Sequence, residues 1–208
     1  MMLPTHALAG MSLAIPVGLL APEFTSIAII AGLIGGIVPD LDMYAGHRKT
    51  LHFPVYYSIL AVLATVLAMW YPATFTIVIA LVLGGAALHC LADIFGNGLE
   101  LRPWEARSQR AVYSHYHGTW IPPKRLVQYD GSPRDLLLTV SLAIPLLIVL
   151  DGALLWLVVS ALSIACAYTA LRRSLPRWAS LIVGLVPTWT MPYVPERYIE
   201  PIDPDVAE

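Results

Sequence analysis

The segment HCLAD, residues 89–93, places His89 and Asp93 four residues apart inside a long apolar run. If the run is helical, both side chains lie on one face, and an imidazole and a carboxylate can reach the same metal ion. Ionisable groups within an apolar helix are costly, and they are usually retained for a partner or a function. The alternative is a His–Asp hydrogen bond between packed helices, and this pair by itself leaves both interpretations open.

Two aspartates and two further histidines extend the pattern. Asp40 and Asp42 follow Pro39 in the segment PDLD, where the chain leaves an apolar run on an extended or turning backbone. Each carboxylate could bind an ion, or one could bridge two ions; a solvated turn is the alternative. His6 opens the first apolar run and His52 precedes a later one, where each could instead be a buried or interfacial histidine.

The whole set, more than any single member, indicates a metal centre. The candidate ligands are His6, Asp40, Asp42, His52, His89 and Asp93. Imidazole and carboxylate ligands without thiolate suit Zn²⁺, Mn²⁺ or Fe²⁺, and Zn²⁺ is favoured. Such a set could hold one or two divalent ions, and two ions about 3.5–4 Å apart would clamp the attacking and leaving oxygens of a hydrolytic displacement.

Further polar residues lie beside these candidates. Arg48 and Lys49 precede His52, and both could bind the oxygens of an anionic substrate, Arg48 through its planar guanidinium. His47 and Arg48 are the predicted catalytic residues, with His47 transferring protons or orienting a ligand. His115 and His117, in the segment YSHYHGTW, are candidate ligands of an additional ion, although such a pair is more often solvated.

The composition indicates what must position these residues. The chain of 208 residues is 58% hydrophobic and only 12% charged, and its apolar residues come in long runs. This pattern is typical of a membrane protein, and the net charge of -2 gives no indication of nucleic-acid binding. We therefore expect an all-α fold, a polytopic membrane bundle of about six transmembrane helices with a short C-terminal hydrophobic segment.

The predicted spans are bounded by proline, glycine or charge. They cover residues 5–21, 24–38, 54–71, 73–95, 135–150 and 153–171, followed by a short run over 178–191 that Pro187 interrupts. Pro16 predicts a kink in the first span. Ala28, Gly32 and Gly36 form a small-residue stripe that lets a neighbouring backbone approach closely. Residues 1–177 are predicted to form one domain, and 195–208 a disordered acidic, proline-rich tail within the C-terminal segment 178–208.

The distribution of basic residues predicts the orientation. Of the 12 Lys and Arg residues, all but Arg197 lie in segments 39–53, 96–134 and 172–177, which the predicted spans place on one side. The positive-inside rule makes this side cytoplasmic. All the histidines fall on the same side, so we expect an inner-membrane protein with its N-terminus and metal site facing the cytoplasm.

The segments THALAG, GGIVPDLD, HRKTLHF and HCLADIFGNG together resemble the YdjM-like (LexA-regulated type) inner-membrane proteins, a family of membrane-bound metal-dependent hydrolases. The resemblance covers residues 4–100 and implies functional roles for His6, Asp40, Asp42, His47, Arg48, His52, His89 and Asp93. Leu51 stands where the family pattern has threonine, and Phe53 where it has serine. The order of ligand types is also loosely similar to that of zinc-dependent phospholipase C and P1-type nucleases.

These observations predict a metal-dependent hydrolase. A metal-activated water would attack a phosphoester or another bond of a membrane lipid or lipid-linked substrate at the cytoplasmic face. The alternatives are a non-catalytic protein whose ion ties helix ends together, and a metal or ion transporter. Transporters place ionisable residues near the middle of the bilayer, whereas the polar residues here gather at one face.

Overall fold

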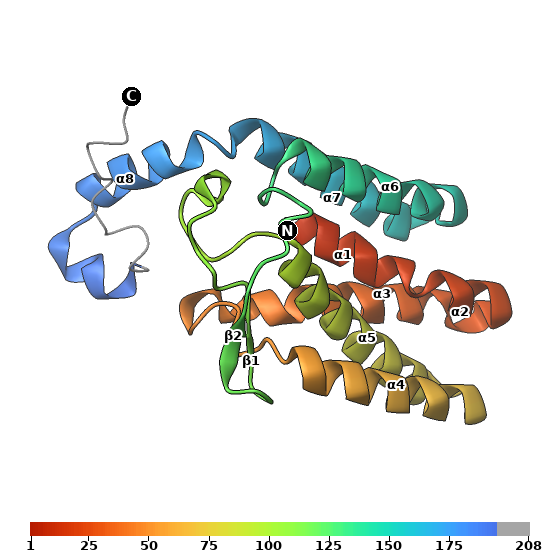
Figure 1. The fold of residues 1–208 in the computed structure, drawn as a ribbon. Coiled ribbons are helices and arrows are strands. Elements are labelled where there is room, and N and C mark those ends of the chain that lie inside the picture. Colours follow the sequence, from red (N-terminus) through yellow and green to blue (C-terminus); the bar gives the residue numbers. More distant parts are fainter. Residues whose placement is uncertain (195–208) are drawn as a thin grey trace.

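In the computed structural model, which describes residues 1–194, apolar helices run side by side and their connections gather at the two ends of the bundle (Figure 1). The helices are α1 (Leu3–Ser12), α2 (Ile15–Leu20), α3 (Thr25–Ile37), α4 (Pro54–Trp70), α5 (Thr74–Phe95), α6 (Pro133–Val149), α7 (Gly152–Leu171) and α8 (Leu175–Leu185). Short 3₁₀ segments are η1 (Pro22–Phe24), η2 (Val38–Tyr44), η3 (Pro103–Glu105) and η4 (Thr188–Tyr193). The predicted disordered tail over 195–208, with Arg197, lies outside the described residues.

Four helical stretches are long and apolar enough to cross a membrane. They are Leu3–Leu20, Pro22–Met43, Thr74–Phe95 and Gly152–Leu171. Two more of the predicted spans, α4 and α6, have 17 residues each, slightly short of the ~20 that a comfortable span needs. On α4 only Pro54 and Ala61 are buried, and large side chains such as Leu63 and Trp70 face outward. An outer surface this apolar suits contact with lipid.

At the predicted kink before Pro16, a turn interrupts the helix. α1 ends at Ser12, a turn covers Leu13 and Ala14, and α2 begins at Ile15. Proline has no N–H to donate to the carbonyl four residues earlier, and its ring clashes with that carbonyl, which here belongs to Ser12. The first apolar run therefore consists of two short helices.

Glycines bring α1, α3 and α5 into backbone contact. A Cβ on Gly32 would collide with the carbonyl of Gly10, and a Cβ on Gly36 with the carbonyl of His6. On the side of α3 that faces α5, a Cβ on Gly85 would lie 2.8 Å from the backbone nitrogen of Gly36. The small-residue stripe of α3 is thus confirmed as a packing feature. It places the first turns of α1, the end of α3 and the last turns of α5 together.

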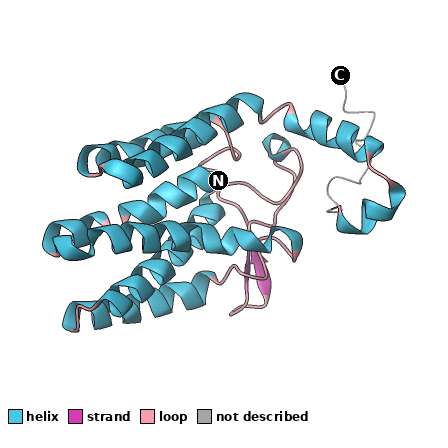
Figure 2. Ribbon diagram, turned by 180° about the vertical axis from the view of Figure 1, so that it is seen from behind, coloured by secondary structure: helices cyan, strands magenta, loops and turns pink. Residues whose placement is uncertain are grey.

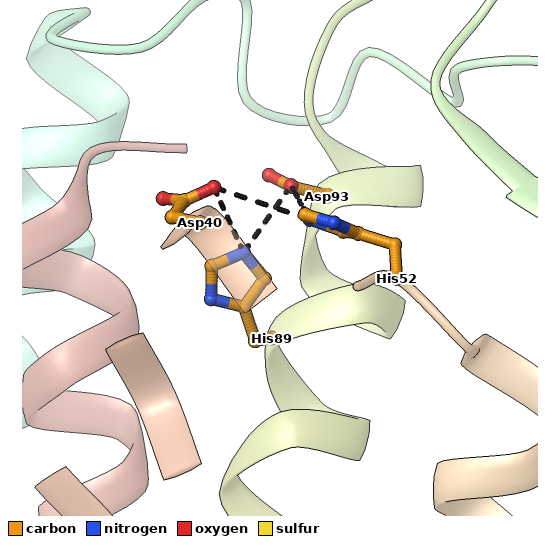
Figure 3. Close-up of side chains that lie close together, drawn as sticks. All are labelled: Asp40, His52, His89 and Asp93. Carbon is orange, nitrogen blue, oxygen red and sulfur yellow. Dashed lines mark ion pairs between the residues drawn. The ribbon is translucent and has the colours of Figure 1, made fainter. Parts of the chain in front are cut away.

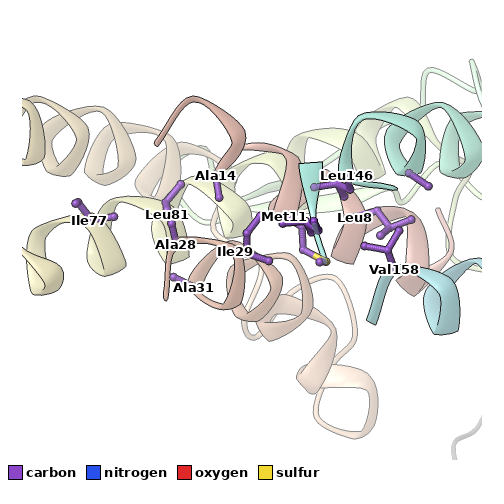
Figure 4. Close-up of a cluster of buried hydrophobic side chains, with 12 residues drawn as sticks. Leu8, Met11, Ala14, Ala28, Ile29, Ala31, Ile77, Leu81, Leu146 and Val158 are labelled. Carbon is purple, nitrogen blue, oxygen red and sulfur yellow. The ribbon is translucent and has the colours of Figure 1, made fainter. Parts of the chain in front are cut away.

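The apolar core lies along these same helices and extends to α6 and α7 (Figure 4). Its buried members are Leu8, Met11, Ala14, Ala28, Ile29, Ala31, Ile77, Leu81, Ala143, Leu146, Leu150 and Val158. Small residues on both helices, such as Gly10 on α1 and Gly32 on α3, let the two helices approach closely.

The expected all-α fold is only partly confirmed: the chain is mostly helical, but the segment between α5 and α6 contains strands. Two short strands there, β1 (Val112–Ser114) and β2 (Thr119–Ile121), form an antiparallel hairpin (Figure 2). Gly118 in its turn has a φ of 65°, a left-handed conformation that glycine adopts readily. The hairpin lies at the end of the bundle that also holds the N-terminus (Figure 1).

The C-terminal run predicted over 178–191 is divided at Pro187 between α8 and η4. α8 begins just beyond α7 and lies apart from the main bundle (Figure 1). Trp178, Leu181 and Ile182 on α8 are exposed.

Candidate metal centre

Three segments bring four potential metal ligands together (Figure 3). His89 and Asp93 lie on the last turns of α5, Asp40 lies on η2 directly after α3, and His52 lies two residues before the start of α4. One nitrogen or oxygen from each residue lies within 4.8 Å of the corresponding atom of every other. Among residues 1–194, this is the group whose spacing suits an ion.

The spacing of these atoms can be compared with that of a metal site. Oδ1 of Asp40 is 3.4 Å from Nε2 of His89 and 3.9 Å from Nε2 of His52. Oδ2 of Asp93 is 3.5 Å and 3.6 Å from the same two nitrogens. Ligands at ~2.0–2.1 Å from a tetrahedral Zn²⁺ stand about 3.3–3.4 Å from one another. These four separations, 3.4–3.9 Å, therefore range from tetrahedral spacing to about half an ångström wider.

Both imidazoles are oriented for metal binding. Nδ1 of His89 donates to the carbonyl of Gly36 at 2.7 Å, and Nδ1 of His52 lies 2.9 Å from Oδ2 of Asp42. A hydrogen bond at Nδ1 fixes the tautomer in which Nε2 carries the lone pair. Nε2 of each histidine is buried and has no hydrogen-bond partner. The lone pair on Nε2 of each histidine is therefore available to coordinate an ion.

The carbonyl of Gly36 is available to accept a hydrogen bond from His89 because of the local sequence. It lies at the end of α3, where carbonyl groups lose their helical partners. In the 3₁₀ register of η2, the partner of Gly36 would be Pro39, which has no N–H. The same proline that ends the helix thus leaves an acceptor for His89.

Asp42 lies outside the group of four, although the sequence predicts it as a ligand. Its Oδ1 accepts from Nδ1 of His47 at 3.0 Å and the N–H of Arg48 at 3.3 Å. Its Oδ2 accepts from His52 and from the N–H of Leu51 at 3.1 Å. Successive residues of a 3₁₀ turn diverge by ~120°, so Asp40 and Asp42 approach the histidines from different directions. Here Asp42 holds histidines in place.

His6 also lies outside the group, but it touches two of its members. Its Nε2 is 3.2 Å from Oδ1 of Asp93, and its ring stacks on that of His89 with centroids 3.7 Å apart. The amino group of Met1 lies 2.8 Å from the same Oδ1. Oδ1 of Asp93 is therefore taken by neighbours, while Oδ2 faces His52 and His89.

The predicted substrate-binding residues differ in their placement. Arg48 is buried, with Nε 3.4 Å from Oδ2 of Asp93 and Nη1 donating to the carbonyls of Asn97 at 2.5 Å and Ala111 at 3.4 Å. Lys49 is exposed, and its Nζ lies 4.7 Å from the centre of the Tyr113 ring. Only Arg48 therefore reaches the metal centre.

The predicted additional pair, His115 and His117, lies on the hairpin turn and outside the group of four. Nε2 of His115 lies 2.6 Å from the carbonyl of Lys49, and its ring stacks on Phe53 with centroids 4.5 Å apart. Nδ1 of His117 lies 2.9 Å from Oγ of Ser114. Together with the N–H of Tyr113, which donates to the carbonyl of Arg48 at 2.9 Å, His115 docks the hairpin onto the loop that precedes His52.

Exposure differs across the centre. The side chains of His52 and His89 are 0% exposed and that of Asp93 is 2% exposed, whereas Asp40 and His47 are 17% and 18% exposed. His47 lies with Nδ1 3.8 Å from Oδ1 of Asp40. The approach from solvent is therefore on the side of Asp40 and His47.

The pKa of His52 reflects competing effects. Burial by itself would lower this pKa because the charged imidazolium loses solvation. The neighbouring carboxylates of Asp42 and Asp93 outweigh burial and raise the pKa of His52 above its ordinary value. Without an ion, a proton is therefore favoured on this imidazole.

Two buried residues that support the centre were not predicted. Asn97 accepts Arg48 at its carbonyl, and its side chain donates to the carbonyls of Pro103 and, at 2.8 Å, Gln128. Its position between two glycines after an apolar helix could have drawn attention to it, since such sequences end helices. Asp135 accepts from the N–H of Met2 at 2.8 Å and from Oγ1 of Thr5 at 2.7 Å, and so joins α6 to the start of α1.

No protein-family model, curated protein or solved structure matches the chain. The chemistry of the centre is accordingly inferred from its geometry.

Proposed function

We propose that this chain is a multi-pass membrane hydrolase that binds a divalent ion, with Zn²⁺ favoured, through Asp40, His52, His89 and Asp93. The observation that carries the proposal is the pair of unpartnered Nε2 atoms on His52 and His89, buried and directed at two carboxylates. Buried polar atoms without a partner are rare because they lose hydration without compensation. A bound ion supplies the missing partner for both.

A divalent ion at this position would lower the pKa of a water ligand and polarise the bond under attack. His47 lies at the more open side, with Nδ1 held by Asp42 and Nε2 left to exchange a proton. An imidazole oriented by a carboxylate is a common general acid–base group. Hydrolysis therefore requires no residue beyond those already gathered at the centre.

The proposed substrate is a phosphoester or related bond of a membrane lipid or lipid-linked molecule. The centre lies where α3 and α5 reach the end of the bundle, and the exposed side chains of Leu41 and Met43 flank Asp40. An apolar rim beside a polar centre suits a substrate with both a headgroup and an acyl chain. The basic segments at this end support a cytoplasmic, inner-membrane location, and the resemblance of residues 4–100 to YdjM-like hydrolases supports the reaction class.

A second candidate is an ion that serves only to join helix ends. The full burial of His52 and His89 favours it, because closed coordination spheres are typical of structural sites. In that case the ion would be retained and would stabilise the protein, but no turnover would depend on it.

Ion content of the purified protein tests the binding site. We expect about one Zn²⁺ per chain in detergent-solubilised wild type by elemental mass spectrometry, and little in His89→Ala and Asp93→Ala. His117→Ala is the matched control, since it removes an exposed histidine away from the centre. Equal, negligible ion content in all four proteins would refute the assignment.

Turnover then separates the two candidates. The ion-loaded protein is assayed on a panel of phosphodiesters and phospholipids, with and without a chelator. Hydrolysis predicts turnover that the chelator abolishes and Zn²⁺ restores, and that His47→Ala reduces by about 10²–10⁴-fold while retaining the ion. An ion-loaded protein without turnover on the panel supports the structural role.

A further inference from the structure

We infer that the guanidinium group of Arg48 occupies the place of a second metal ion, so that the centre combines a single divalent ion with one fixed positive charge. This inference rests on the proposed function, because it presupposes the ion held by Asp40, His52, His89 and Asp93. It concerns the number of ions and the role of Arg48, which the group of four does not determine.

One carboxylate oxygen of Asp93 faces both the proposed ion position and the guanidinium group of Arg48. Its Oδ2 is the atom that lies 3.5 Å and 3.6 Å from the imidazole nitrogens of His89 and His52. The same Oδ2 is 3.4 Å from Nε of Arg48. In two-ion hydrolases, two cations about 3.5–4 Å apart share the site. Asp93 thus has the position of a bridging carboxylate, with the ion on one side and the guanidinium on the other.

Burial and hydrogen bonds hold the side chain of Arg48 in this position. The residue is 8% exposed, and two backbone carbonyls, those of Asn97 and Ala111, hold its Nη1. Its backbone has a φ of 60°, and the N–H of Tyr113 donates to its carbonyl at 2.9 Å. Nε has no hydrogen-bond partner in this arrangement. Because arginine is not deprotonated in proteins, the charge beside Asp93 is permanent.

The neighbouring residues offer no ligand set for a second ion. Both oxygens of Asp42 are occupied by donors from His47, Arg48, Leu51 and His52. Two of these donors are backbone N–H groups, which would lose their acceptor if Asp42 bound an ion. Nε2 of His6 is turned to Oδ1 of Asp93, which the amino group of Met1 also contacts, so His6 would supply one ligand without a complete set. Among residues 1–194, the remaining His and carboxylate side chains supply no second group with suitable spacing.

A fixed guanidinium would serve a hydrolase differently from a second ion. It neutralises Asp93 and presents positive charge to an anionic substrate, and Arg recognises phosphate oxygens well. Unlike an ion, it is not lost to chelators. The expected consequence is a centre that needs one ion for full occupancy.

The ion stoichiometry of the wild type is the first test. The detergent-solubilised full chain is dialysed against excess Zn²⁺ or Mn²⁺, washed and measured by elemental mass spectrometry. One tightly held ion per chain is expected. Two tightly held ions that Asp93→Ala removes together would overturn the inference and leave the proposed metal site standing. Absence of any tightly held ion would instead refute the proposed function.

Substitution of Arg48 is the second test, with Lys49→Gln as the control that removes the adjacent exposed charge. Arg48→Gln is expected to keep the ion and to bind it equally or severalfold more tightly, because a positive charge near the ligand oxygen is gone. Arg48→Lys and Lys49→Gln are expected to stay within about threefold of the wild type. Loss of ion affinity by tenfold or more in both Arg48 variants would show that Arg48 builds the site, which would overturn the inference. If Arg48→Gln does not fold, the wild-type stoichiometry and Arg48→Lys decide.

Discussion

Nδ1 of His52 lies 2.9 Å from Oδ2 of Asp42, and both side chains are shielded from solvent. The second oxygen of the same carboxylate holds His47 at the more open side of the centre. One aspartate therefore orients both a histidine that faces the ion position and a histidine suited to proton transfer. Such supporting carboxylates fix the ring and strengthen the imidazole as a ligand.

This relationship predicts different effects for the two aspartates of PDLD. Asp42→Asn should weaken Zn²⁺ binding by about 10–100-fold and preserve one ion per chain, because the imidazole of His52 remains but is held less well. Asp40→Asn removes a ligand and should be more severe. Affinity is measured by competition with a chromophoric chelator. A loss of stoichiometry in Asp42→Asn equal to that in Asp93→Ala would show that Asp42 is a ligand.

His6 provides a comparable test. Its Nε2 faces the oxygen of Asp93 that points away from His52 and His89, so His6 should support the centre without binding the ion. His6→Gln keeps a polar group near Asp93 and should retain one ion per chain with affinity reduced by at most about 100-fold. The same competition titration measures it, and complete loss of the ion in a folded His6→Gln protein would identify His6 as a ligand.

Ion binding should depend on pH in a defined direction. The raised pKa of His52 favours a proton on the imidazole when no ion is bound, and the ion requires the neutral ring. Below that pKa the ion must displace a proton, so affinity should rise with pH, by about tenfold per unit for one proton displaced. Mn²⁺ titrations between about pH 6 and 8 would measure the slope.

Asp42→Asn supplies the control for this slope. Loss of the carboxylate removes one cause of the raised pKa of His52, so the rise in affinity should end at a lower pH. An affinity that is independent of pH in the wild type would contradict the prediction.

The glycine contacts predict a difference between two adjacent residues of α5. A Cβ on Gly85 would lie 2.8–2.9 Å from backbone atoms of α3, which cannot rotate away. At Gly84 the nearest atom is 3.4 Å away and belongs to the side chain of Leu13. Gly85→Ala should therefore lower the free energy of unfolding by about 1–3 kcal/mol, whereas Gly84→Ala should be neutral or slightly stabilising.

Thermal unfolding in detergent would measure both alanine variants. Because α5 carries His89 and Asp93 and Asp40 lies on η2 directly after α3, Gly85→Ala should also weaken Zn²⁺ binding. Equal melting temperatures for the two variants would contradict the close contact of α3 and α5.

Much of the helical framework could be predicted from apolar runs, because their lengths and boundaries are local properties of the chain. The HxxxD spacing also predicted correctly that His89 and Asp93 face one point, since residues four apart share a helix face. The distinction between Asp40 and Asp42 could not be predicted. It depends on the 3₁₀ turn after α3, and the sequence left extended and turning conformations open.

The hairpin and the burial of Arg48 could not be predicted from the sequence either, for a different reason. Strands of three residues show no measurable alternation, and β1 also pairs with the carbonyl of Arg48, which is distant in sequence. Phe53, directly before α4, stacks on His115 of the hairpin turn. Contacts between segments this far apart depend on the assembled structure.

The order of the ligands along the chain has a consequence for biosynthesis. Asp40, His52, His89 and Asp93 all precede α6 and α7, and those two helices contact the other helices mainly through α1. The glycine contacts among α1, α3 and α5 are likewise complete by the end of α5. A nascent chain that has inserted α1 to α5 already contains every ligand. If these residues bind an ion as proposed, the ion would join segments of the first half of the protein before the second half is synthesised.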